Sequence, residues 1–265
     1  MSTKYVWMGI VISIMVGILP CLSHAKIDPN TIVGMWLLDE NKGDVISDSS
    51  GNEHHGQITG QAKWVKGKFG NALEIGAANF ARVLHADDLS LKTFTVTIWF
   101  STKSSGAWIG VLSKSHNNPT RNYTVYIHKD NNTASISIGN EAGGNWQDTS
   151  GTTVVNDGEW HHIAITFDDN TDVGRVFTDG VKEGQYTVAN KVPQNNADVT
   201  FAAWHHAGGN SGFTGLLDEI AIFNVALEEA DVRDVMQKGL SELLGAPVEP
   251  QDKLTTKWGK IKSFK

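Results

Sequence analysis

Two adjacent acids, Asp218 and Glu219, interrupt an alternating apolar stretch that runs over residues 212–223. Alternation with a period of two is typical of a strand with one buried face. The pattern places Asp218 on the same face as the apolar residues Leu216, Ile220 and Ile222. A buried carboxylate needs a hydrogen-bond donor or a cation as its partner.

A second group of oxygen-bearing side chains lies in the stretch 48–56, which begins with Asp48 and ends with a glycine. Carboxylate, hydroxyl and amide oxygens so close together suit a hard cation such as calcium. If the first and last strands of the domain are neighbours, this loop lies near Asp218. The alternative is that Asp218 only accepts backbone hydrogen bonds.

Exposed aromatic faces and planar polar groups are what a carbohydrate site requires. Trp108, Trp146 and Trp204 are candidates, whereas Trp36, Trp99 and Trp160 lie inside alternating strands and are predicted core residues. The predicted ligand-binding rim lies in loops at one end of the domain, where rigid folds place binding groups. It consists of Trp146, Trp204, His205, Arg121 and Asn145. Packing of Trp146 in the core and an exposed polar loop at His205 are the alternatives.

Catalytic patterns are weak in this sequence. A glycosidase needs two carboxyl groups flanking the scissile bond, but the strand around Glu219 carries no second glutamate. A Gly-x-Ser-x-Gly elbow, a His-Glu-x-x-His helix and a phosphate loop are all missing from the sequence. The adjacent pair His161 and His162 points to opposite faces of a strand and is a poor zinc chelator. We therefore predict that the protein is not an enzyme.

The N-terminal residues 1–25 have the organisation of a cleaved signal peptide, with Lys4, an apolar run and a cleavage site at Ala25. A retained membrane anchor and a lipoprotein signal at Cys21 are the alternatives. Removing this segment removes the only cysteine from a chain whose formal net charge is −7. An acidic secreted protein without a basic patch is a poor partner for nucleic acid, and no membrane span is expected after cleavage.

Short strand-like runs follow one another from Ile32 to Phe223, separated by Gly, Asn, Asp and Ser. The dipeptide Asp179-Gly180 predicts a tight hairpin. A single helix is expected from Leu227 to about Leu240, with acids in its first turn and Gly239 near its end. Residues 242–265 are expected to form a linker and a basic tail, so the predicted domain covers residues 26–241.

Seven motifs in order carry a family resemblance, and they extend from about Ile27 to Leu240. They are Val33-Gly-Met-Trp-Leu-Leu-Asp39, Asp48-Ser-Ser-Gly-Asn52, Gly67-Lys-Phe-Gly-Asn-Ala-Leu-Glu74, Phe94-Thr-Val-Thr-Ile-Trp99, Trp160-His-His-Ile-Ala164, Thr178-Asp-Gly180 and Phe213-Thr-Gly-Leu-Leu-Asp-Glu219. Together they resemble the laminin G-like, concanavalin A-like jelly-roll domains of secreted bacterial proteins.

The resemblance implies an all-β fold, a two-sheet antiparallel jelly-roll sandwich with one short C-terminal helix. It also implies structural calcium (Ca2+) bound by Asp48 and Asp218, with Asn52 as a further ligand. Because this fold hosts many functions, the resemblance leaves several open. We expect a secreted, calcium-stabilised binding module for a glycan or a surface protein. A glycan hydrolase or lyase and a purely structural adhesion module are the alternatives.

Overall fold

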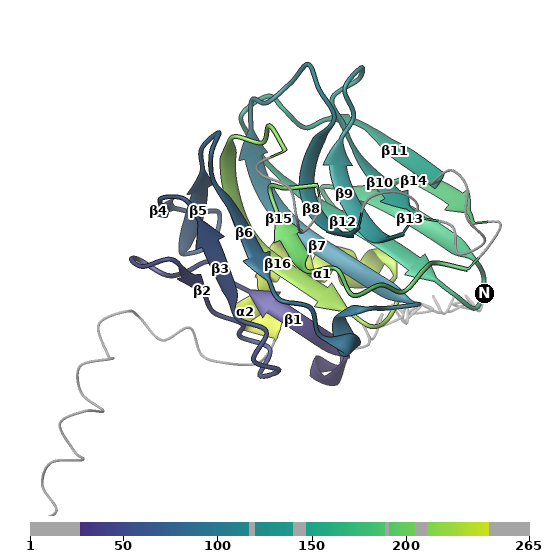
Figure 1. Ribbon diagram of the computed structural model, residues 1–265. Helices are drawn as coiled ribbons and strands as arrows, with labels where there is room; N and C mark the ends of the chain where they lie inside the picture. The colour runs from purple at the N-terminus through teal and green to yellow at the C-terminus, as the bar shows by residue number, and fades with distance from the viewer. Residues whose placement is uncertain (1–26, 117–119, 140–146, 189–190, 205–210, 244–265) are drawn as a thin grey trace, which may run out of the picture.

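The computed structural model describes residues 27–116, 120–139, 147–188, 191–204 and 211–243. Within these residues nearly every regular element is a strand, and the strands form two sheets packed face to face (Figure 1). All of the strand pairs are antiparallel. The predicted jelly-roll sandwich is therefore confirmed.

The first sheet contains the long strands from the middle and the end of the chain. Its order is β14 (Val181–Thr187), β13 (Val173–Thr178), β12 (Trp160–Asp168), β7 (Phe94–Thr102), β16 (Gly215–Phe223), β5 (Asn71–Ile75) and β4 (Lys63–Lys66), and β1 (Ile32–Trp36) also pairs with β16. The pairing of β1 with β16 shows that the first and last strands of the domain are neighbours.

The second sheet supports the aromatic residues described below. Its order is β11 (Gln147–Val154), β10 (Thr133–Ile138), β9 (Arg121–Ile127), β8 (Ile109–Ser115), β15 (Val199–Phe201), β6 (Phe80–Val83), β3 (Gly56–Thr59) and β2 (Val45–Ile46). Two short 3-10 turns, η1 (Pro29–Thr31) and η2 (Asp87–Leu89), lie outside the sheets. The sequence did not predict β11, whose residues are mostly polar and only partly buried.

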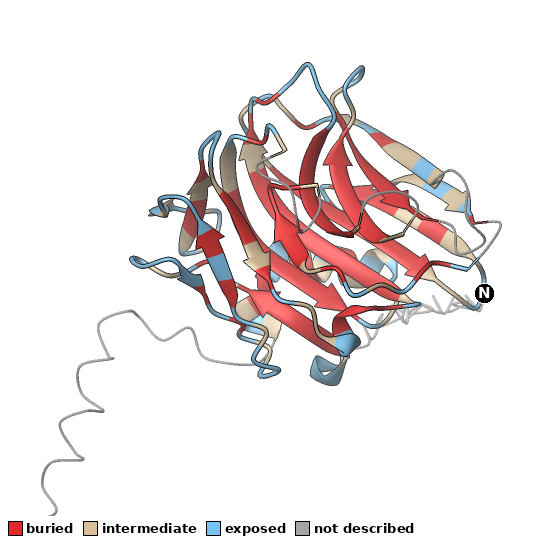
Figure 2. Ribbon diagram, viewed as in Figure 1, coloured by how far each residue is buried: buried red, intermediate tan, exposed pale blue. Residues whose placement is uncertain are grey.

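The main core lies between the two sheets, where buried residues of both inner faces meet (Figure 2). Trp36 is fully buried there, 5.3 Å from Phe201 between ring centroids. A Cβ atom at Gly34 would lie 2.5 Å from the Trp36 ring, so this position has room only for glycine. Trp99 is also buried, as predicted, but Trp160 is only half-buried.

The turn between β13 and β14 is the tight hairpin predicted from its dipeptide. Asp179 and Gly180 have φ angles of 50° and 75°, and Thr178 pairs with Val181. Positive φ at both central residues matches the right-handed twist of the flanking strands, and this is why Asp-Gly is favoured there.

A bulge in β16 changes the face assignment made from sequence. The register shifts between Asp218 and Ala221, and Glu219 has a φ of 48°. Leu217 belongs to the core between the sheets, whereas Ala221 belongs to the cluster on the outer face of the first sheet. Asp218, next to Leu217, therefore points outward rather than into the main core, and the predicted strict alternation was wrong.

The C-terminal helical region covers the outer face of the first sheet (Figure 1). Helix α1 (Glu229–Lys238) begins two residues later than predicted, since its N-cap Glu228 has an extended backbone; the N–H of buried Leu227, before the helix, donates to Thr95 Oγ1. It ends at Gly239, whose φ is 75°, and a second short helix, α2 (Leu240–Leu243), follows. No helix in the described residues is long and apolar enough to cross a membrane.

Candidate functional site

A cavity of about 410 Å³ opens on the outer face of the second sheet. Its lining residues are Trp108, Arg121, Tyr126, Asp148 and Trp204. Arg121 and Tyr126 belong to β9 and Asp148 to β11, while Trp108 directly precedes β8 and Trp204 follows β15. Residues from distant parts of the sequence thus meet over neighbouring strands.

The strand alternation of β9 explains why this face is polar. Val125 and Ile127 belong to the core, so Thr124 and Tyr126 point to the opposite side. Thr124 Oγ1 lies 3.0 Å from Ser113 Oγ on β8, so small hydroxyl side chains of both strands face this side. Short side chains on the neighbouring strands leave space above the sheet, and the larger aromatic rings border that space.

The three aromatic rings form a continuous wall. Tyr126 is in the middle, with its ring centroid 5.5 Å from that of Trp108 and 5.9 Å from that of Trp204. Trp108 is 39% exposed, so it keeps a face open to a ligand. A Cβ atom at Gly110 would lie 3.1 Å from the Trp204 ring, so a glycine there lets the indole lie close to the sheet.

Arg121 adds a fixed cation to this wall. Its Nη1 donates to Ser137 Oγ at 2.7 Å, and its guanidinium carbon lies 5.8 Å from the Trp204 ring centroid. Burial lowers the pKa of Arg121, while the nearby Asp148 carboxylate acts in the opposite direction. Burial, and then Asp148, raise the pKa of the Tyr126 hydroxyl well above its usual range. The cavity therefore combines a guanidinium, a carboxylate, a neutral phenol and aromatic faces.

Two residues of the predicted rim, Arg121 and Trp204, meet in this cavity. Trp146, Asn145 and His205 lie outside the described residues. Trp108 was identified from sequence as an aromatic candidate but was not assigned to the rim. Tyr126 and Asp148 were missed: Tyr126 resembles any residue of an alternating strand, and Asp148 lies on the unpredicted β11.

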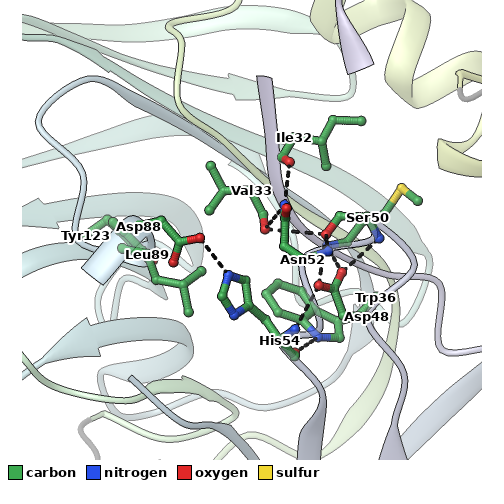
Figure 3. Close-up of polar contacts among 11 residues, drawn as sticks. Ile32, Val33, Trp36, Asp48, Ser50, Asn52, His54, Asp88, Leu89 and Tyr123 are labelled. Carbon is green, nitrogen blue, oxygen red and sulfur yellow. Dashed lines mark hydrogen bonds and ion pairs between the residues drawn. The ribbon is translucent and has the colours of Figure 1, made fainter. Parts of the chain in front are cut away.

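Asp48, the first predicted calcium ligand, organises its own loop (Figure 3). Its Oδ1 accepts hydrogen bonds from the backbone N–H groups of Met35 and Ser50, at 3.0 and 2.9 Å. Its Oδ2 accepts from the His54 N–H at 2.9 Å and from the Ser50 hydroxyl at 2.8 Å. Asp48 is buried, with only 8% of the residue exposed. Both of its oxygens thus already have donors.

The second and third predicted ligands contact different segments. The Asn52 side-chain amide donates to the carbonyls of Ile32 and Val33, at 3.1 and 2.8 Å. Asp218 Oδ2 accepts from the N–H groups of Lys68 and Phe69, at 2.8 and 3.0 Å. A calcium ion shared by all three residues would have to replace several of these hydrogen bonds.

No group of three or more His, Cys, Asp or Glu residues in the described ranges is arranged to hold a metal ion. Asp218 Oδ1 is buried and has no hydrogen-bond partner among those residues. Among the three predicted calcium ligands, Asp218 Oδ1 is therefore the atom that best fits an ion. Asp48 better fits the role of a hydrogen-bond acceptor for its own loop. The calcium site stays a prediction.

The acidic pair Asp218 and Glu219 does not form an accessible catalytic dyad. Burial raises the pKa of Asp218 to about 8 and that of Glu219 to about 7. Glu219 accepts a hydrogen bond from the backbone N–H of Leu240, at the start of α2. Both residues are at least 97% buried, with exposures of 0% and 3%, and neither lines the aromatic cavity.

Comparisons with known proteins agree with this architecture. A family model described as the concanavalin A-like lectin/glucanases superfamily matches residues 76–233, more than half of the chain. No curated protein matches the sequence.

Similar solved structures share the fold at low sequence identity. Domain 4 of AbnA, an extracellular arabinanase from Geobacillus stearothermophilus solved with arabinotriose, has a TM-score of 0.65 and 21% identity, covering 78% of this chain and 98% of that one. The binding domain of Paraclostridial Mosquitocidal Protein 1 has a TM-score of 0.65 and 16% identity, covering 79% and 52%. The binding domain of botulinum neurotoxin DC, solved with SialylT, has a TM-score of 0.65 and 12% identity, covering 80% and 52%. The chain spans about half of each toxin structure.

Proposed function

Because the chain belongs to the concanavalin A-like lectin/glucanases superfamily, we propose that it is a binding module that takes a carbohydrate in its aromatic cavity. The observation that carries the proposal is the wall of Trp108, Tyr126 and Trp204 beside Arg121 and Asp148. Aromatic faces stack on the C–H faces of sugar rings, and the planar ionic groups bind hydroxyls.

The size and shape of the cavity support a carbohydrate over a large protein surface. A volume of about 410 Å³ falls in the range of small-molecule sites. The arabinanase domain was solved in complex with arabinotriose, and the toxin domain was solved in complex with SialylT. A surface protein is the second candidate partner, since a related toxin structure was solved with rat synaptotagmin II.

We propose that the module has no catalysis of its own and is secreted after cleavage near Ala25. Burial of Asp218 and Glu219 supports the first part, because neither carboxyl group reaches the aromatic cavity. Incubation with the bound glycan should release no product, and mass spectrometry of the mature protein should find Lys26 at its N-terminus. If the wild type released reducing ends from the glycan and Glu219→Gln did not, the proposed absence of catalysis would be contradicted.

We expect Trp204→Ala and Arg121→Ala to weaken capture of the best ligand on a glycan array about 30-fold each. This is the loss that a hot spot of about 2 kcal/mol produces. Arg121→Lys should recover little binding, because lysine lacks the planar fork of donors. The measurement is titration of each variant against the selected glycan.

Val181→Ala is the matched control, since Val181 is 53% exposed at the edge of the other sheet. Trp146→Ala tests the predicted extension of the rim. Unaltered affinity in both Trp204→Ala and Arg121→Ala would exclude the cavity as the binding site. A fall in melting temperature without loss of affinity would show that these side chains serve packing alone.

We propose calcium as a structural ion, supported by the unpartnered Asp218 Oδ1 and by the sequence resemblance. An ion that binds only the folded state stabilises it by about 2.7 kcal/mol at a hundredfold excess over its dissociation constant. Chelation should therefore lower the melting temperature of the wild type, and Asp218→Ala should remove that response. Identical melting curves with and without chelator would leave hydrogen bonding as the role of Asp48, Asn52 and Asp218.

A further inference from the structure

A second cavity, of about 390 Å³, opens beside η2. It is lined by His85, Asp87, Ser90, Gln194, Asn195 and Asn196, all of them polar. The aromatic cavity shares none of these residues. Some of these polar groups maintain the shape of the cavity, and others face a ligand.

Asn195 and Ser90 hold the floor in place. The Asn195 side-chain amide donates to the carbonyls of Thr120 and Lys114, at 2.7 and 3.3 Å, and its oxygen accepts from the Ala197 N–H at 3.0 Å. The Ser90 hydroxyl donates to the Asn195 carbonyl at 3.0 Å and accepts from its N–H at 2.9 Å. A floor with so many internal bonds is preorganised.

The η2 wall is fixed from two sides (Figure 3). Asp88 pairs with His54 Nε2 at 3.0 Å, and the Leu89 carbonyl accepts from the Tyr123 hydroxyl at 3.0 Å. Asp87, the first residue of η2, lines the cavity, and its side chain is fully exposed. The rigid turn therefore presents a carboxylate to solvent at a defined position.

A buried cation lies behind the cavity. Lys114 is fully buried, and its Nζ lies 3.1 Å from His85 Nδ1 and 2.6 Å from the Ala197 carbonyl. Burial lowers the pKa of Lys114 to about 8, although Asp198, Asp87 and Asp88 oppose the shift. Burying an ammonium group costs free energy, so its position against a lining residue of a cavity indicates a role beyond packing.

Lys114 determines which nitrogen of His85 carries the hydrogen. An ammonium group can only donate, so His85 Nδ1 must accept, and the neutral ring then carries its hydrogen on Nε2. That nitrogen lies 3.4 Å from Asp87 Oδ1, on the cavity side. His85 is thus oriented as a donor toward the Asp87 carboxylate, which lines the opening.

Two amide side chains also keep unused polar atoms. Gln194 Nε2 donates to the Ser90 carbonyl at 2.6 Å, and Asn196 Oδ1 pairs with His116 Nε2 at 2.6 Å. Among the described residues, Gln194 Oε1 and Asn196 Nδ2 have no hydrogen-bond partner. The opening therefore presents a donor on Asn196 and an acceptor on Gln194, beside the paired His85 and Asp87, whose carboxylate is exposed.

We propose that this polar cavity is a second binding site, which takes the hydroxyl groups of a neutral carbohydrate. Each hydroxyl both donates and accepts, so a mixed set of donors and acceptors suits it, while the Asp87 carboxylate disfavours an anionic ligand. Lys114 acts as a positioning residue through His85. This site is separate from the aromatic cavity and does not depend on it.

Titration of isotope-labelled protein with arabinotriose, xylotriose and cellotriose tests the proposal. The side-chain amide signals of Gln194 and Asn196 should shift saturably with at least one of these trisaccharides. Asp87→Ala and Asn196→Ala should each weaken this binding about tenfold, as expected when one hydrogen bond is lost. Asp130→Ala, in another exposed turn, is the matched control and should bind like the wild type.

The indole N–H signals of Trp108 and Trp204 report separately on the aromatic cavity. If the amide signals of Gln194 and Asn196 shift while the indole signals stay unchanged, the sugar binds in the polar cavity. That result would support this second site and overturn binding in the aromatic cavity. Amide signals that stay unchanged with all three sugars, or that shift as strongly in Asp87→Ala, would overturn the second site.

Lys114→Met, which replaces the ammonium group by an unbranched apolar side chain one atom shorter, tests the positioning role. In the wild type we expect the His85 Nδ1 resonance at its unprotonated position, and the variant should show a mixture of tautomers with weaker sugar binding. A His85 spectrum that is the same in both proteins would contradict the role of Lys114.

Discussion

Asp48→Ala is expected to lower the free energy of unfolding by about 4 kcal/mol, because it removes a buried carboxylate that accepts from four donors. The N–H groups of Met35, Ser50 and His54 would lose their partner, the first in a buried position and the other two in half-buried positions. Hydrogen bonds to a charged group contribute about 1.5–3 kcal/mol each, and a buried donor left unsatisfied costs about 1–3 kcal/mol. Water entering the vacated space offsets part of this sum.

Urea denaturation in the presence of chelator measures this loss independently of calcium. Asp48→Asn keeps one acceptor oxygen and should lie between the wild type and Asp48→Ala. Asp130→Ala is the control, since its exposed side chain should change stability by no more than about 0.5 kcal/mol. A loss below about 1 kcal/mol for Asp48→Ala would show that the loop tolerates unpaired donors.

Acid is expected to destabilise the fold through His162, which is fully buried on β12. Burial lowers its pKa from 6.5 to about 3, with Asp179 opposing the shift. Between these values the unfolded chain binds a proton that the folded protein excludes. Stability from this group is therefore present above pH 6.5 and is lost as the pH falls toward 3, by about 1.4 kcal/mol per pH unit.

The raised pKa values of Asp218 and Glu219 act in the opposite direction. The stabilisation that these two groups contribute to the folded protein is lost as the pH rises toward about 8 and about 7, respectively. The wild-type profile alone therefore mixes both effects. His162→Phe isolates the histidine, because both ring nitrogens of His162 have no hydrogen-bond partner among the described residues. The stability of this variant relative to wild type should rise steadily from pH 6.5 to pH 4.

His161→Gln is the matched control of opposite sign. Its hydrogen bond to Asp179, at 2.8 Å, raises the pKa of His161 despite partial burial. That stabilisation is fully present below pH 6.5 and is lost as the pH rises, so the cost of His161→Gln should grow toward acid. A His162→Phe difference that does not change with pH would show that the folded protein admits the proton at position 162.

Local sequence patterns account for much of the secondary structure. The alternation in β7, β12 and β9 and the Asp179-Gly180 turn were read correctly because each depends on neighbours within a few residues. β11 escaped notice because its polar residues are only partly buried at the edge of a sheet. The helix was predicted two residues too early: Glu228 is an extended N-cap, and Leu227 before it contacts Thr95, far away in the sequence, which no local pattern shows.

The order of residues along the chain by itself determined the all-β class, the tight turns and the presence of residues suited to ligands. Only the tertiary structure decided which of them meet. Arg121 and Trp204 share a cavity because β9 and β15 both pair with β8. Asp48 and Asp218 each accept backbone N–H groups of different segments, because the bulge at Glu219 points Asp218 toward Lys68 and Phe69. Strand pairing and register are set by contacts distant in sequence, so the pattern along one strand cannot specify them.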